Sequence, residues 1–199
     1  MILLGIDTAG PRLQLALMRE TGTVDTLIED LAKGHAEIVF GRIEKLLSHN
    51  GVTYQDLGRI AVTTGPGSFT GLRIGMSAAR GLGLALEIPV IGVPSLLAIS
   101  LQGVSGSPSL PFSVAVPAGR GATYYQAFIA PGVPDGEAQL VGTDGLGDGR
   151  QILGGPFCDV ERLAVFAAVA DPDAFPPNPT YVRDADAKPQ DKARIARQS

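Results

Sequence analysis

Residues 60–75 read Ile-Ala-Val-Thr-Thr-Gly-Pro-Gly-Ser-Phe-Thr-Gly-Leu-Arg-Ile-Gly, and this stretch decides the fold. Its first five residues are apolar or β-branched, which is typical of a buried strand. The strand must end at Pro66, which has no N–H for a ladder and has a glycine on each side. Ser68 or Thr70 can then cap the helix that we expect over residues 70–86. The stretch therefore predicts a strand, a tight loop and a helix.

Small residues recur at every fourth position of this predicted helix, so they lie along one ridge of its surface. A glycine inside a helix costs about 1 kcal/mol relative to alanine, and several glycines therefore need a reason. Close approach by another element is such a reason: a strand of the same sheet, a second helix or a partner protein. The ridge is formed by Gly71, Gly75, Ala79 and Gly83, and the apolar residues beside it are Leu72, Met76, Leu82 and Leu86.

Length and composition narrow the class of protein. The chain has 199 residues, 45% of them hydrophobic, which suits one domain or two small lobes. The net charge of −4 gives no overall basic footprint for nucleic acid. The single cysteine, Cys158, excludes an internal disulfide and a multi-cysteine zinc site. No apolar run approaches the ~20 residues of a membrane span, and residues 1–7 lack the basic lead of a signal peptide, so we expect a cytoplasmic protein.

The first half of the chain predicts three strands followed by alternating helices and strands. Residues 2–6 form a continuous apolar run, as in a central strand buried on both faces. Short links between the first three strands indicate an antiparallel meander, and the later alternation indicates a mixed α/β sheet covered by helices. The expected strands are 2–6, 13–17, 24–28, 60–64 and 88–93, and the expected helices are 36–49, 70–86 and a short one from Pro94.

The second half predicts a smaller unit. Residues 102–111 are rich in Gly, Ser and Pro, which is typical of a lobe boundary. We therefore divide the chain into a first lobe (1–101), a linker (102–111), a smaller second lobe (112–183) and a mobile charged tail (184–199). The expected elements of the second lobe are strands 112–116, 123–129 and 151–155, a helix over 160–170, and an extended proline-rich segment over 171–179.

No motif for catalysis stands out. The glycine loop lacks the lysine of a phosphate-binding P-loop, although the helix start after it can bind an anion weakly. Ser68 does not lie in the G-x-S-x-G context of a serine hydrolase. The two histidines, His35 and His49, lie about 21 Å apart along one helix, too far for a shared metal ion. Cys158 is expected to be a buried, inert thiol. Asp7 ends the first strand, either as a carboxylate that binds a nucleotide-bound metal or as a turn-forming residue beside Thr8.

Residues 64–75, Thr-Gly-Pro-Gly-Ser-Phe-Thr-Gly-Leu-Arg-Ile-Gly, resemble the signature of the bacterial TsaB (YeaZ) family of tRNA threonylcarbamoyladenosine biosynthesis proteins. Asp7-Thr8-Ala9, His35 and the segment 179–183 match further family positions. The resemblance implies the ribonuclease-H-like fold of the actin, sugar kinase and Hsp70 group. The family's usual polar residues in the hairpin of the second lobe are replaced here by Pro117, Gly119 and Ala122, which puts any role of that turn in doubt.

The resemblance implies a non-catalytic scaffold that pairs with the related TsaD subunit and recruits the TsaE ATPase. TsaD transfers threonylcarbamoyl to N6 of the adenosine beside the anticodon of tRNA. The chain would then hold no firmly bound cofactor, with ATP and magnesium entering through the complex, and when isolated it could form a homodimer. Two alternatives stay open: a small actin-like ATPase or kinase that uses Asp7, and a peptidase.

We assign no catalytic or metal-binding residue and place the partner interface on the first helix and on the helix with the ridge. The predicted interface residues are His35, Val39, Arg42, Gly71, Leu72, Gly75, Met76, Ala79 and Gly83. The family signature loop comprises Gly65, Pro66, Gly67, Ser68, Phe69, Thr70 and Arg73, and a vestigial nucleotide site would comprise Asp7 and Thr8.

Overall fold

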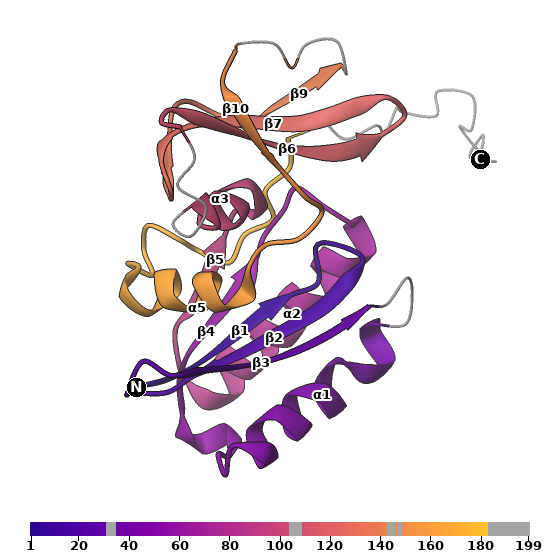
Figure 1. Ribbon diagram of the computed structural model, residues 1–199. Helices are drawn as coiled ribbons and strands as arrows, with labels where there is room; N and C mark the ends of the chain where they lie inside the picture. The colour runs from indigo at the N-terminus through magenta and orange to yellow at the C-terminus, as the bar shows by residue number, and fades with distance from the viewer. Residues whose placement is uncertain (31–34, 104–108, 143–145, 147–148, 183–199) are drawn as a thin grey trace, which may run out of the picture.

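The computed structural model describes residues 1–30, 35–103, 109–142, 146 and 149–182. Figure 1 shows one sheet with helices packed on it and a second sheet at the other end of the molecule, beyond the short helix α3. The predicted mixed-sheet α/β fold is confirmed. None of the helices within the described ranges has the length and hydropathy needed to cross a bilayer.

The first sheet has the strand order β3-β2-β1-β4-β5. The apolar strand β1 lies at its centre, antiparallel to β2 and parallel to β4, as the run at residues 2–6 predicts. The strand before the glycine loop begins at Leu57, earlier than expected, and lies directly beside β1. The strands are β1 (Ile2–Asp7), β2 (Arg12–Met18), β3 (Val24–Asp30), β4 (Leu57–Thr63) and β5 (Val90–Val93).

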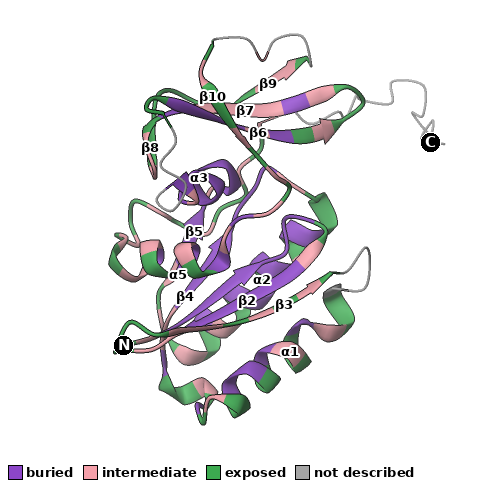
Figure 2. Cartoon of the chain, viewed as in Figure 1, coloured by how far each residue is buried: buried purple, intermediate pink, exposed green. Residues whose placement is uncertain are grey.

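Helices cover both faces of this sheet, and the alternation of side chains along β1 shows how. Leu4 and Ile6 pack with the apolar residues of α1 and α2. Leu3 packs on the opposite side, and a Cβ on Gly5 would lie 3.7 Å from the Cβ of Ala164 in α5. The centre of the sheet is therefore buried on both faces, whereas the edge strand β3 is partly exposed (Figure 2). The helices are α1 (His35–His49), a 3₁₀ turn η1 (Tyr54–Asp56), α2 (Phe69–Leu86), α3 (Ser95–Ser100) and α5 (Val160–Val169).

The second sheet has the order β10-β6-β7-β8, with β9 also paired to β7. Phe112 and Phe128 stack across the β6–β7 pair with ring centroids 5.8 Å apart. Pro117, Gly119 and Ala122 lie at the end of this hairpin, as the sequence predicts. The two short strands β8 and β9 were not expected. The bounds are β6 (Phe112–Gly119), β7 (Ala122–Ala130), β8 (Val133–Pro134), β9 (Gln139–Gly142) and β10 (Gln151–Gly154).

After β10 the chain returns to the first sheet, which corrects the expected extent of the second lobe. Helix α5 packs on the first sheet, where Arg59 Nη1 donates hydrogen bonds to the carbonyls of Ala167 (2.8 Å) and Ala170 (2.9 Å). The segment that follows is tied to the same sheet, because Thr180 N donates to the carbonyl of Thr64 at 2.9 Å. Residues 160–181 thus belong to the first packing unit. The predicted mobile tail, residues 184–199, lies outside the described residues.

Candidate functional site: the outer face of α1 and α2

The glycine loop fastens α2 to the ends of β1 and β5. Ser68 is the N-cap of α2, and its Oγ accepts a hydrogen bond from Gly71 N at 3.2 Å, which settles the choice between Ser68 and Thr70. Ser68 N donates to the carbonyl of Ala9 at 2.7 Å, and Ser95 N donates to the carbonyl of Gly65 at 2.6 Å. The loop therefore holds the start of α2 in place through backbone contacts with its own sheet.

The ridge of small residues on α2 faces the first sheet of the same chain. A Cβ on Gly71 would overlap the carbonyl oxygen of Thr8, and one on Gly75 would overlap Thr8 Oγ1. Thr8 Oγ1 also donates to the carbonyl of Gly71 at 2.7 Å, and the side chain of Val90 leaves no room for a Cβ on Gly83. The structure corrects the prediction that a partner helix lies along this ridge, because Thr8, directly after β1, and Val90 of β5 already fill the space beside its glycines. The corrected positions are Gly71, Gly75, Ala79 and Gly83, all of them buried.

The other predicted interface residues divide between core and surface. Val39 is 2% exposed and belongs to the core between α1 and the sheet, so it cannot itself be a free contact. Arg42 forms an ion pair with Glu29 of β3. Leu72 and Met76 are 7% and 6% exposed and form part of the floor of a surface depression. His35 is the first residue of α1; its side chain lies outside the described residues.

Opposite the ridge, α1 and α2 present two exposed aromatic side chains to solvent. Phe40 of α1 is 51% exposed, and Phe69 at the start of α2 is 56% exposed. They border a depression of about 460 Å³ between the two helices, which we call the outer groove. Half-exposed aromatic side chains beside a depression are candidate contacts for a partner, because aromatic residues are enriched at protein interfaces. The outer groove is lined by Ala36, Val39, Phe40, Phe69, Thr70, Arg73, Ile74, Ser77 and Ala78.

A second depression, of about 390 Å³, continues along α2. One wall comes from the segment after α5, where Tyr181 is 63% exposed. We call it the C-terminal pocket. Because residues from α2 and from the far end of the described chain meet here, sequence spacing alone could not show it. The C-terminal pocket is lined by Phe69, Leu72, Arg73, Met76, Ser77, Arg80, Pro179 and Tyr181.

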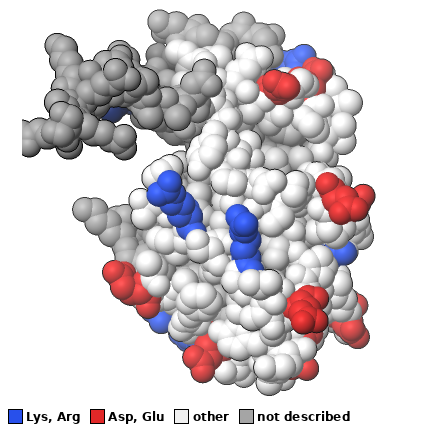
Figure 3. Space-filling model, turned by 180° about the vertical axis from the view of Figure 1, so that it is seen from behind, with Lys and Arg blue, Asp and Glu red and all other residues white. Residues whose placement is uncertain are grey.

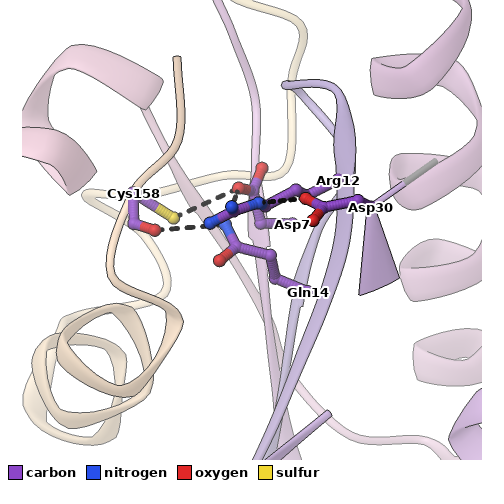
Figure 4. A network of polar contacts seen from close by, with 5 residues as sticks. All are labelled: Asp7, Arg12, Gln14, Asp30 and Cys158. Carbon is purple, nitrogen blue, oxygen red and sulfur yellow. Dashed lines mark hydrogen bonds and ion pairs between the residues drawn. The ribbon is translucent and has the colours of Figure 1, made fainter. Parts of the chain in front are cut away.

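Asp7 and Thr8, the candidate nucleotide site, are both buried. Figure 4 shows the Asp7 carboxylate with Gln14 and Cys158 directed toward it. Asp7 is 1% exposed, and its carboxylate accepts four hydrogen bonds. Oδ1 accepts from Ala9 N (2.9 Å) and Thr63 Oγ1 (2.7 Å). Oδ2 accepts from Gln14 Nε2 (2.8 Å) and Cys158 Sγ (3.3 Å). The carboxylate is therefore fully occupied by the chain's own donors.

Cys158 belongs to a strap, residues 156–158, that crosses the ends of β1 and β2. Burial raises the pKa of the Cys158 thiol well above its ordinary value, and the nearby carboxylate of Asp7 raises this pKa further. A neutral thiol that donates to Asp7 is a poor nucleophile, as expected of an inert cysteine. Phe157 lies under the guanidinium of Arg12, 4.0 Å from it, and Arg12 in turn forms an ion pair with Asp30. The strap is thus held by two contacts, Cys158 with Asp7 and Phe157 with Arg12.

These residues do not fit a magnesium–nucleotide complex. The cavity at Asp7 has a volume of about 20 Å³, which is space for about one water molecule. A larger cleft of about 800 Å³ lies outside it, between the glycine loop and the β6–β7 hairpin. The described residues lining this cleft include Glu37 but no lysine or arginine that could neutralise a phosphate chain. Within the described residues there is also no cluster of three His, Cys, Asp or Glu side chains suited to a metal ion.

Sequence reasoning missed the residues that surround Asp7 and those that form the outer face. Gln14 was detectable as a polar residue inside the apolar strand Leu13–Leu17, but its partner Cys158 lies 144 positions away. Phe40 was also detectable, because it lies beside the apolar stripe of α1 that Val39 and Ile43 define. The glycine spacing drew attention to the wrong side of α2.

The strand order 3-2-1-4-5, with helices on both faces of a mixed sheet, defines the class of ribonuclease-H-like α/β proteins. A family model described as tRNA N6-adenosine threonylcarbamoyltransferase (TsaD) matches residues 27–130, just over half of the 199-residue chain. The chain belongs to this family, and over about half of its length it is similar to curated proteins named TsaB.

Two curated relatives of this chain are named tRNA threonylcarbamoyladenosine biosynthesis protein TsaB. The one from Bacillus subtilis is 38% identical over 103 residues, covering 52% of this chain and 45% of the relative. The one from Escherichia coli is 37% identical over 100 residues, covering 50% of this chain and 43% of the relative. The chain therefore spans about half the length of the curated relatives it matches.

Solved structures share the fold over nearly the whole chain. A Pseudomonas aeruginosa protein described as similar to peptidase YEAZ superposes with a TM-score of 0.78 at 22% identity, covering 92% of this chain and 99% of the other. A second structure, YeaZ from Pseudomonas aeruginosa, gives a TM-score of 0.76 at 21% identity, covering 90% and 99%. The predicted ribonuclease-H-like fold and the predicted family are confirmed.

Proposed function

We propose that this chain is an accessory subunit in the synthesis of tRNA threonylcarbamoyladenosine and that it binds a TsaD-like catalytic subunit through the outer face of α1 and α2. The catalytic subunit would transfer threonylcarbamoyl to N6 of the adenosine beside the anticodon. The family resemblance adds a TsaE-like ATPase and tRNA as further members of the complex. The names of the curated relatives support the pathway.

The observation that carries this proposal is the outer groove. Two half-exposed phenylalanines, Phe40 and Phe69, border an apolar depression on neighbouring helices. An aromatic side chain that is exposed in the free protein and buried in a complex is a typical centre of binding energy. The groove is also adjacent to the residues that resemble the family signature, since Phe69, Thr70 and Arg73 line it.

The burial of Asp7 supports an accessory role over the alternative of a small actin-like ATPase. That alternative requires the carboxylate to approach a nucleotide-bound metal, yet Asp7 is buried and accepts four hydrogen bonds from its own chain. A peptidase has no better support, because Ser68 Oγ caps α2 and the Cys158 thiol is buried with a raised pKa.

Titration calorimetry of the chain with a TsaD-like subunit tests the proposal. Phe40→Ala should weaken binding about 30-fold or more, since truncating a central aromatic typically costs at least ~2 kcal/mol. Val169→Ala serves as the matched control, because Val169 is an 87% exposed apolar residue on α5, outside the outer groove. Both variants should melt close to wild type.

The proposal is wrong if the two subunits do not associate, or if Phe40→Ala and Val169→Ala change the affinity equally. Binding of ATP and magnesium to the isolated chain, abolished by Asp7→Asn without loss of stability, would instead support the ATPase alternative.

A further inference from the structure

Two arginines lie on the outer face of α2 without a carboxylate partner among the described residues. Arg73 and Arg80 are both exposed and are separated by seven residues, so they lie on the same side of the helix about 10 Å apart. The guanidinium of Arg73 lies over the ring of Phe69, 3.8 Å from its centre. An arginine in cation–π contact with an aromatic ring can still donate its N–H groups to a ligand.

The surface around these arginines is uncharged. Arg73 lines both the outer groove and the C-terminal pocket, Arg80 lines the C-terminal pocket, and neither lining contains an Asp or Glu. This is notable in a chain with 20 acidic residues and a net charge of −4. Helix α2 lies behind the sheet in Figure 1, so Figure 3 shows its outer face: basic side chains stand amid uncharged surface, and the carboxylates lie toward the margin.

The wall of the C-terminal pocket that Pro179 and Tyr181 form is held in place by hydrogen bonds to the first sheet. Thr180 N donates to the carbonyl of Thr64 at 2.9 Å, and the hydroxyls of Thr64 and Thr180 are 3.0 Å apart. These bonds hold the segment whose neighbouring residues Pro179 and Tyr181 line the pocket together with Arg80. The pocket thus combines two cationic groups, an apolar floor from Leu72 and Met76, and an exposed aromatic side chain.

We propose that the C-terminal pocket binds an acidic segment of the partner protein, with partner carboxylates paired to Arg73 and Arg80. This inference rests on the proposed function and names the chemistry of the partner's surface. Guanidinium groups match carboxylates in a two-pronged geometry, and two arginines seven residues apart fit carboxylates at the same spacing on a partner helix. The apolar floor and the negative net charge favour a protein over a nucleic acid, which needs many cations and little apolar surface.

The test is titration of the chain with the TsaD-like subunit at two ionic strengths. Arg80→Glu should lower the affinity about tenfold or more at low salt, because a like charge then faces the partner's carboxylates. The loss should shrink between about 50 mM and about 500 mM salt as the charges are screened. Lys45→Glu is the matched control: it makes the same change of charge at an exposed position of α1 outside both linings, and it should change the affinity less than about threefold. All proteins should have the same melting temperature.

The outcomes separate this inference from the proposed function. If Phe40→Ala weakens binding and Arg80→Glu does not, the acidic partner segment is wrong and the proposed function stands. If the wild-type proteins do not associate, both are wrong. Loss of tRNA binding by Arg80→Glu, with unchanged affinity for the catalytic subunit, would assign the arginines to phosphates. Loss of self-association alone, measured by analytical ultracentrifugation, would assign them to a second copy of the chain. Either result would overturn the inference.

Discussion

The two sides of α2, a helix of 18 residues, differ in side-chain size and in what they contact. The inner side consists of small residues, and Thr8 and the side chain of Val90 occupy the space that larger residues would need. The outer side carries Phe69, Arg73 and Arg80, all exposed. A stripe of glycines on a helix therefore indicates only that another element packs closely against it. In this chain that element is the chain's own sheet. The residues available to a partner are the large ones on the opposite side.

The largest expected effect comes from filling the inner side. Gly71→Ala places a methyl group where the carbonyl oxygen of Thr8 lies, and backbone cannot rotate away as a side chain can. We expect a loss of unfolding free energy of about 3 kcal/mol or more, at the upper end of overpacking costs. Thermal or urea denaturation of the isolated chain measures it.

Gly81→Ala is the matched control on the same helix. Gly81 is exposed, and a Cβ there would meet nothing within 4 Å. The substitution should stabilise the chain by up to ~1 kcal/mol through helix propensity alone. Equal effects of Gly71→Ala and Gly81→Ala would contradict the assignment of the two sides.

A smaller loss is expected at Asp7, next to the threonine that contacts the inner side. In Asp7→Asn one acceptor oxygen becomes an amide that faces the donors Gln14 and Cys158, or Ala9 and Thr63. Leaving such buried donors unsatisfied should cost about 2–3 kcal/mol of unfolding free energy. A variant that melts like wild type would show that the carboxylate is not engaged in this way.

The strap beside Asp7 predicts a dependence of stability on pH. Because the pKa of Cys158 is raised in the folded chain, the unfolded thiol ionises first as the pH rises. The contribution of the neutral thiol is complete below the ordinary thiol pKa of about 8.5 and is lost above it, by up to ~1.4 kcal/mol per pH unit.

Denaturant unfolding of wild type and Cys158→Ser between pH 7 and 10 checks this expectation. The serine hydroxyl keeps a donor for Asp7 but does not ionise in that range, so the difference between the two proteins should widen above the ordinary thiol pKa. A constant difference across the range would mean that the thiol is not buried at Asp7.

The smallest effect is expected at Leu84, an 83% exposed residue of α2 outside both depressions. Leu84→Ser should change the unfolding free energy by at most about 0.5 kcal/mol, as at most surface positions. It should also leave the affinity for a TsaD-like subunit unchanged. Weakened association would extend the interface along α2 beyond the outer groove and the C-terminal pocket.

Local patterns were sufficient to predict most of the fold. The apolar run at residues 2–6 led to the central strand, and the glycines around Pro66 led to the turn before α2. Both signals come from residues that are adjacent in the sequence, so they can be recognised without knowing the three-dimensional structure. The return of α5 to the first sheet could not be predicted this way, since it depends on contacts such as Arg59 with Ala167, over a hundred positions apart.

The candidate site was harder to predict for the same reason. The signature loop pointed to the helix that carries the proposed interface, and Leu72, Met76 and Arg73 line its surface depressions. The sequence alone could not show which side of the helix was free, because that depends on where Thr8 and Val90 lie in space. Tyr181 joins the pocket only through the hydrogen bonds of Thr180 with Thr64.

Hydrogen–deuterium exchange of the chain, alone and with a TsaD-like subunit, tests the central claim most directly. The claim is that the outer side of α1 and α2 binds the partner while the inner side serves the chain's own sheet. We predict that complex formation slows amide exchange in residues 36–42 and 69–81, whereas exchange in β6 and β7 stays unchanged. Unchanged exchange in the two helices, with slowing confined to β6 and β7, would contradict the account.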